Sequence, residues 1–118
     1  MEITSQDLNR IELITVRGRV DSVEAVRFQE ALNAANQRGK YRLVIDMSQL
    51  EYMSSAGFRA LAAAQRNVQR HRDGQLILTQ LPVAVHEALE VVGFTEHFKI
   101  IDPLSAALEY AQSSPASS

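Results

Sequence analysis

Two hydrophobic periods alternate along the 118 residues of the chain. Short apolar runs, which are typical of strands, occur at residues 2–8, 11–17, 43–45, 75–80 and 98–101. Between these runs, apolar side chains recur at helical spacing and predict helices at about 22–37, 56–72, 83–92 and 103–112. We therefore expect the order β-β-α-β-α-β-α-β-α.

This order predicts the topology of the sheet. Strands that alternate with helices need crossover connections and pair in parallel, whereas the first two strands are close enough to form an antiparallel hairpin. Asn9 and Arg10 would form its turn, because Asn tolerates a positive φ. The expected fold class is α/β: a single domain, residues 1–112, with a mixed and mostly parallel sheet of about five strands covered by about four helices. Residues 113–118 are expected to form a flexible C-terminal tail.

Several residues have the chemistry of helix ends. Asp21 is a good N-cap with Glu24 three positions later, close to a capping box. Gly39 and Gly93 follow the last apolar positions of two helices and predict their C-termini. Asp102 is expected to cap the last helix, with Pro103 in its first turn.

The stretch from Leu43 to Leu61 is the centre of the expected fold. Leu43 to Ile45 reads as a strand buried on both faces, and Asp46 and Ser48 bring polar groups where we expect this strand to end. The serine pair Ser54 and Ser55 then precedes a helical pattern. Loops beyond the carboxyl ends of strands are where α/β proteins build sites. One serine would cap the helix, and the other would be exposed.

A hydroxyl at a helix N-terminus lies in a positive local field. A phosphate there would add about −1.5 to −2 charges at pH 7, which that field favours. Arg59 lies four residues after Ser55 and is placed to reach back to such a phosphate. The alternative is that both serines serve only to cap the helix.

Composition restricts the classes of function. The net charge is −2, so nothing indicates a broad basic surface for direct contact with nucleic acid. The absence of cysteine excludes thiol catalysis and is compatible with a reducing compartment. The N-terminus lacks the pattern of a signal peptide, and no apolar run approaches the ~20 residues of a membrane span. We expect a cytoplasmic protein without membrane insertion.

Enzyme chemistry finds little support in the chain. His71, His86 and His97 are widely spaced and match no metal-ligand motif. Ser54 to Gly57 does not match the serine elbow of hydrolases, and no glycine-rich phosphate loop is present. We therefore expect no enzyme activity, no cofactor and no bound metal.

A family resemblance adds to this interpretation. Asp46-Met47-Ser48, followed by Tyr52-Met53-Ser54-Ser55-Ala56-Gly57-Phe58, resembles the signature of STAS domains, the anti-sigma factor antagonists. Gly18-x-Val20-Asp21 resembles a second pattern of this family. Ser55 falls on the phospho-acceptor position of the family. Many members have Asp before it, where this chain has Ser54, so Ser54 is the second candidate for modification.

The resemblance implies a partner-switching protein. Unphosphorylated on Ser55, it would bind an anti-sigma factor that is also a serine protein kinase, and phosphorylation would release it. A serine phosphatase would restore the first state. The residues expected to meet the partner are Asp21, Ser54, Ser55, Ala56, Gly57, Phe58 and Arg59, with Asp46 and Ser48 supporting the loop.

Two questions stay open at this stage. One is an alternative function, a constitutive STAS scaffold in a signalling complex or a lipid-transport ABC assembly. With either function, we expect the chain to be a monomer or weak dimer. The other question concerns the polar side of the second predicted helix, which is either a solvated face or a contact patch for an acidic partner. It carries Gln65, Arg66, Gln69, Arg70, His71 and Arg72.

Overall fold

The structure is a computed structural model that describes residues 1–113. Its strands are β1 (Glu2–Leu8), β2 (Ile11–Val20), β3 (Arg42–Met53), β4 (Gln75–Thr79) and β5 (Lys99–Ile100). Its helices are α1 (Glu24–Gln37), α2 (Ser55–Gln69), α3 (Val83–Val91), the short 3-10 helix η1 (Thr95–His97) and α4 (Leu104–Ser113). The predicted order of strands and helices is confirmed, with η1 as an addition that no sequence pattern indicated.

The five strands form one sheet in the order β1-β2-β3-β4-β5. β1 and β2 pair antiparallel, and every later pair is parallel, as the crossover argument predicts. Asn9 has a φ of 75° in the turn between β1 and β2, as predicted for that hairpin. The sequence therefore predicts both the fold class and the direction of each strand correctly.

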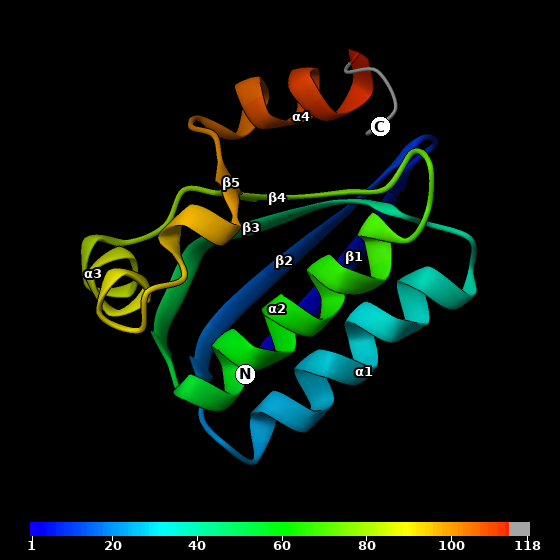
Figure 1. Cartoon of the computed structure of the whole chain (residues 1–118). Helices are drawn as coiled ribbons and strands as arrows, with labels where there is room; N and C mark the ends of the chain where they lie inside the picture. Colours follow the sequence, from blue (N-terminus) through cyan, green and yellow to red (C-terminus); the bar gives the residue numbers. More distant parts are fainter. Residues whose placement is uncertain (114–118) are drawn as a thin grey trace.

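Helices cover both faces of the sheet, as Figure 1 shows. α1 and α2 lie side by side across one face, and α3 contributes to the same large apolar cluster. The fully buried Phe28 of α1, Leu61 of α2 and Ile45 of β3 belong to this cluster. α4 lies across the opposite face, where a smaller cluster includes Val44, Ile77 and Ala107. Burial of these side chains provides the main driving force for folding.

The central strand β3 is much longer than expected. It does not end at Asp46 and Ser48 but continues to Met53, directly before the serine pair. An extra residue of β3 enters the pairing with β2 after Asp46, and another enters after Leu50, so the strand contains two β-bulges. The Asp46 carboxylate accepts a hydrogen bond from the Ser48 N–H at 3.0 Å, which satisfies a donor at the first bulge. The two polar residues thus mark a distortion of the strand and not its end.

Other ends also differ from prediction. β2 continues past Gly18 to Val20, because Gly18 adopts a φ of 88° at the irregular pairing with β3. The Asp102 carboxylate accepts a hydrogen bond of 2.5 Å from the Gln80 N–H, so it joins the end of β4 instead of capping α4. Two predicted C-termini are confirmed, since Gly39 and Gly93 follow α1 and α3 with positive φ.

The last helix is tied to the sheet by arginines. Arg42, which is 2% exposed, donates to the carbonyl oxygen of Ala111 at 2.7 Å, and Arg10 donates to that of Gln112 at 2.8 Å. Ser113, which we assigned to the tail, is the last residue of α4. Residues 114–118 of the predicted tail lie outside the described residues. Within the described part, no helix has the length and apolarity to cross a membrane.

Candidate functional site

The two serines occupy different positions at the start of α2. Ser54 is the N-cap, with extended backbone (φ −76°, ψ 168°), and its Oγ accepts a hydrogen bond from the Gly57 N–H at 3.3 Å. Ser55 is the first residue of the helix, and it is exposed. The sequence left open which serine caps the helix, and the geometry assigns that task to Ser54. The hydroxyl of Ser55 is therefore available at the positive end of α2.

The serine pair is fixed to the ends of two strands. The Ser54 N–H donates to the carbonyl oxygen of Val20 at 2.8 Å, which links the serine pair to the end of β2. A Cβ added at Gly57 would lie 2.5 Å from Cγ of Met53 and 3.2 Å from Cγ1 of Val20. Glycine therefore lets the first turn of α2 approach β2 and β3 closely without displacing the Met53 side chain.

Not all residues expected to meet a partner reach the surface. Gly57 is buried and Phe58 is 2% exposed, so both lie beneath the surface of the site. Ala56 is partly buried, whereas Arg59 is exposed. The buried Phe58 follows from its place on the apolar face of α2, which the helical spacing had already indicated.

Asp21 lies at the same edge of the sheet as the serine pair, because it follows Val20 directly. Its Oδ1 accepts from the Glu24 N–H at 2.8 Å and its carbonyl oxygen accepts from the Ala25 N–H at 2.9 Å. The regular helix begins at Glu24 with Val23 as its N-cap, so Asp21 starts the turn that leads into α1 and is not its N-cap as predicted. The Glu24 carboxylate accepts from Arg27, so the second half of the expected capping box is not formed. Asp21 remains exposed.

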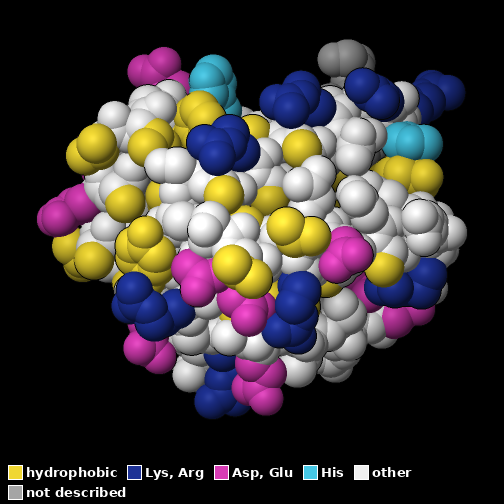
Figure 2. All heavy atoms as spheres, turned by 90° about the horizontal axis from the view of Figure 1, so that it is seen from below, with side chains coloured by type: hydrophobic (Ala, Val, Ile, Leu, Met, Phe, Trp, Pro, Cys, Tyr) yellow, Lys and Arg dark blue, Asp and Glu magenta, His cyan; other side chains and the backbone are white. Residues whose placement is uncertain are grey.

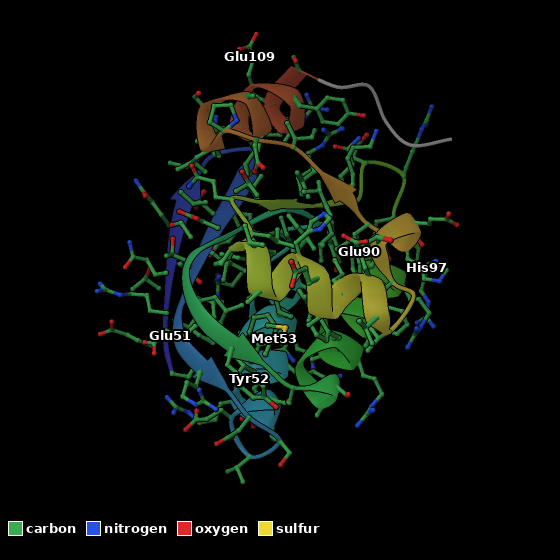
Figure 3. All side chains as sticks on the ribbon, turned by 90° about the vertical axis from the view of Figure 1, so that its left-hand side faces the viewer. Glu51, Tyr52, Met53, Glu90, His97 and Glu109 are labelled. Carbon is green, nitrogen blue, oxygen red and sulfur yellow. The ribbon has the colours of Figure 1, made fainter. Side chains whose placement is uncertain are left out.

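Sequence reasoning missed two exposed valines beside this edge. Val23 and Val26, at the start of α1, are 75% and 62% exposed. The signal in the sequence is that both valines are apolar but lie outside the buried face of α1 defined by Ala25 and Phe28. Exposed Tyr52 lies next to Met53 near the end of β3 (Figure 3). The Arg19 guanidinium lies over its ring, 4.5 Å from the ring centroid. The edge that holds Ser55 therefore has apolar as well as polar neighbours.

Asp46 and Ser48 are not brought to the serine pair. Besides the bond to Ser48, the Asp46 carboxylate, in the middle of β3, accepts from Nε2 of Gln80, which follows β4, at 3.2 Å. Both residues precede the last part of β3, which separates them from Ser54. Their role in this structure is to shape β3, so the expected direct support of the loop is not present.

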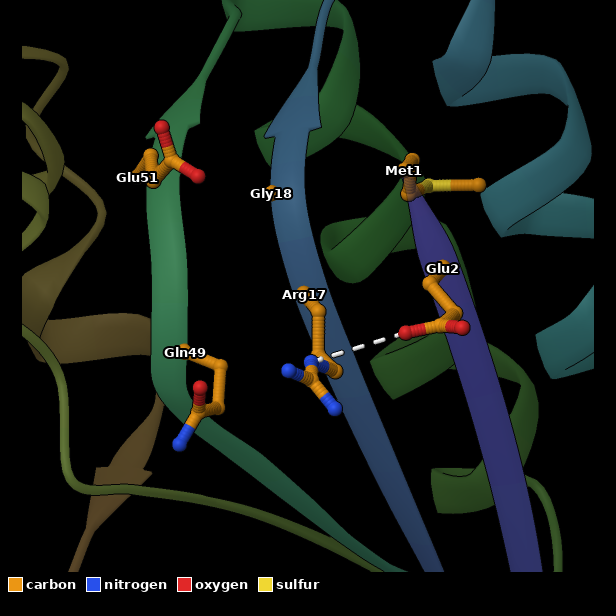
Figure 4. Close-up of a pocket in the computed structure, with 6 residues that line it drawn as sticks. All are labelled: Met1, Glu2, Arg17, Gly18, Gln49 and Glu51. Atoms are coloured by element: carbon orange, nitrogen blue, oxygen red, sulfur yellow. Dashed lines mark ion pairs between the residues drawn. The ribbon is translucent and has the colours of Figure 1, made fainter.

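A polar hollow of about 330 Å³ lies on the strands β1 to β3 (Figure 4). Arg17 and Glu2 face each other in it, with Nε and Oε1 3.5 Å apart, and Gln49 and Glu51 lie on the neighbouring strand. All these groups are open to solvent on at least one side. Ser54 and Ser55 do not line the hollow, so it is separate from the serine site.

The fold and the serine site together define the class of this protein. A family model described as "Mlab, STAS domain" matches residues 5–103, and the chain belongs to this family of STAS domains. The site on which the resemblance was based, from Asp46 to Phe58, lies within the matched residues.

The chain is also similar to individual members described as anti-sigma factor antagonists. The chain is 30% identical over 107 residues to BtrV of Bordetella bronchiseptica, a candidate anti-sigma factor antagonist, with 91% of each chain covered. It is 27% identical to the anti-sigma-B factor antagonist of Listeria monocytogenes, with 85% of this chain and 86% of the relative covered. The fold is also that of an anti-sigma factor antagonist from Mycobacterium paratuberculosis, with a TM-score of 0.85, 22% identity, and 95% and 94% of the two chains covered.

Proposed function

We propose that this protein is an anti-sigma factor antagonist whose binding to its partner is switched by phosphorylation of Ser55. The proposal rests on the different positions of the two serines: Ser54 caps α2, and Ser55 presents an exposed hydroxyl at the same helix end. The names of the two curated relatives support the same class of function.

In the unphosphorylated state, the surface around Ser55, Arg59 and Asp21 would dock on an anti-sigma factor and free its sigma factor. All three residues are exposed. Ser54, Ala56, Gly57 and Phe58 would hold this surface in shape from beneath. The exposed apolar side chains of Val23 and Val26 extend the same edge and would add buried area to the contact.

Phosphorylation would convert a neutral contact into an anionic one. The Ser55 Oγ attacks the γ-phosphorus of ATP, ADP leaves, and the hydroxyl proton is released. The partner kinase supplies ATP and the catalytic groups, and this chain supplies only the acceptor. The new phosphate is tolerated at the positive end of α2, but its charge and hydration oppose burial against the partner. A loss of about 2.8 kcal/mol would weaken binding roughly a hundredfold.

The proposal is tested by incubating the protein with the kinase from its own organism and ATP, followed by mass spectrometry. We expect one phosphate on Ser55, no transfer to Ser55→Ala, and continued transfer to Ser54→Ala. Removal of the phosphate by a serine phosphatase should restore binding. Transfer to Ser54 alone, or to neither serine, would contradict the proposal.

The constitutive scaffold is the competing function, and it predicts a different outcome. The Ser54 side chain in place of the family's Asp is the feature that keeps it under consideration. A scaffold would bind its partners with equal affinity as the natural protein and as the Ser55→Asp variant. It would also copurify with a transporter ATPase or a stable signalling assembly, whereas the switch would copurify with a serine kinase.

A further inference from the structure

The arginines of α2 and Arg72 just beyond it have no side-chain partner, unlike the other Lys and Arg residues of the described chain. α2 contains no Asp or Glu, while it carries Arg59 and Arg66 and ends at the C-cap Arg70. All three are exposed, and within residues 1–113 none of them forms an ion pair or side-chain hydrogen bond. Arg72, just beyond the helix, is also exposed and shares this lack of partners in the described part.

The remaining Lys and Arg side chains of residues 1–113 all have partners. These partners are carboxylates for Arg17, Arg27, Arg38 and Lys40, main-chain carbonyls for Arg10 and Arg42, and tyrosines for Arg19 and Lys99. Lys and Arg side chains without a partner are thus concentrated on α2 and on Arg72 just beyond it, in a chain whose net charge is −2. In Figure 2, some Lys and Arg side chains lie along the upper border with few Asp or Glu side chains beside them, while others lie lower on this face among Asp and Glu.

The three arginines lie in line with Ser55. At 3.6 residues per turn, Ser55, Arg59, Arg66 and Arg70 fall within roughly 60° of one another around the helix axis. Positions 55 to 70 span roughly 22 Å along that axis, which corresponds to about seven residues of an extended chain. We call Arg59, Arg66 and Arg70 the arginine stripe. Ser55 stands at its N-terminal end.

We propose that the arginine stripe binds an acidic segment of the partner protein, laid along α2 from Ser55 to Arg70. This inference rests on the proposed function for the identity of the partner and adds the chemistry by which it is recognised. An acidic segment is favoured by charge complementarity, because the guanidinium groups of the stripe have no partner and α2 contains no Asp or Glu. Nucleic acid fits less well, since the chain as a whole is acidic and would repel a long polyanion.

The stripe also connects recognition to phosphorylation. Arg59 lies four residues after Ser55, the spacing at which side chains on a helix meet. A phosphate on Ser55 would therefore pair with Arg59 and withdraw it from the partner. It would also place about −1.5 to −2 charges beside a stripe that carries three positive ones. Phosphorylation would thus weaken binding both by repulsion and by occupying part of the recognition surface.

The test uses a decaglutamate peptide as the acidic probe, titrated into the intact isotope-labelled protein at low salt and followed by NMR. We expect shifts concentrated on α2 that disappear as ionic strength rises. The double variant Arg66→Gln/Arg70→Gln should weaken binding about tenfold. The matched double variant Arg17→Gln/Arg27→Gln removes the same charge from other exposed sites and should change affinity less than about twofold.

Three results would overturn the inference: equal losses in the two double variants, shifts spread over the whole surface, or tighter binding of a single-stranded DNA decamer than of decaglutamate. Ser55→Glu should weaken binding of the peptide while Ser55→Ala should not. This experiment needs no kinase and no sigma factor. Failure of phosphate transfer to Ser55 would therefore refute the proposed function, whereas failure of the peptide titration would refute the arginine stripe.

Discussion

The main-chain N–H of Ser54 donates a hydrogen bond of 2.8 Å to the carbonyl oxygen of Val20. The pairing of β2 with β3 ends at Val20 and Met53, and this bond continues it by one residue to the start of α2. It holds the serine pair at the edge where Asp21 also lies, although Asp21 and Ser55 are distant in the sequence. The geometry of the site therefore depends on the sheet, and the first two predictions concern how α2 is held against it.

Substitution of the two serines should separate a structural role from a chemical one. Ser54→Ala removes the acceptor for the Gly57 N–H and should lower the free energy of unfolding by about 1 kcal/mol. Ser55→Ala removes an exposed hydroxyl and should change it by less than about 0.5 kcal/mol. Ser54→Asp, which restores the residue common in the family, should retain the cap. Urea denaturation measures the free energy of unfolding of the three variants. Equal losses for Ser54→Ala and Ser55→Ala would contradict the assignment of Ser54 as the cap of α2.

Gly57→Ala should destabilise the protein because the new methyl group meets Met53 at 2.5 Å. The cost of such overpacking is about 1–3 kcal/mol. Shortening Met53 should relieve it, so the double variant Gly57→Ala/Met53→Ala should lose less stability than the sum of the single variants. Thermal and urea unfolding give the comparison. Strict additivity would show that the two residues do not compete for the same space.

The turn between β1 and β2 should add stability that depends on pH. The Lys40 ammonium, which bonds Asp7 Oδ1 at 2.7 Å, and the Asn9 N–H, at 2.8 Å, hold the pKa of Asp7 below its ordinary value. A lowered pKa means that folding favours the ionised form of Asp7. The stabilisation by the ionised carboxylate is therefore complete above the unfolded pKa of about 3.9, and it is lost as pH falls through the lower pKa of the folded state. Asp7→Asn should therefore be less stable than the natural protein at pH 7. The difference should shrink below about pH 4, as melting temperatures across pH will show.

The attachment of α4 should depend on one buried guanidinium. Burial is the main cause that lowers the pKa of Arg42, and the charge of Arg10 lowers it further. The guanidinium nevertheless remains protonated at neutral pH. Arg42→Met would leave the Ala111 carbonyl without this donor and should cost about 1.5–3 kcal/mol. Arg10→Met, at the exposed Gln112 carbonyl, should cost less than about 1 kcal/mol. Amide hydrogen exchange measures the effect: faster exchange confined to α4 shows that the helix detaches locally, whereas faster exchange throughout the chain shows global unfolding.

The pattern of apolar positions was sufficient to predict most of the fold. Strand and helix periods differ, so the order of elements follows from local sequence, and the order in turn restricts the pairing of strands. Gly39 and Gly93 were correctly placed at helix ends because the conformational freedom of glycine acts within a single turn. Asp21 was correctly placed near the start of α1, but the regular helix begins three residues later, at Glu24. Asp102 was misplaced because its carboxylate has a competing partner, the Gln80 N–H, that is distant in the sequence.

The sequence by itself determined the elements, their order and the presence of two hydroxyls at the start of a helix, since these depend on contacts within a few residues. Only the tertiary structure decided that Ser54 caps while Ser55 is exposed, and that β3 continues through two irregular pairings with β2 and ends at Met53. These outcomes arise where one segment meets another. Burial and long-range hydrogen bonds then choose among local conformations of similar energy.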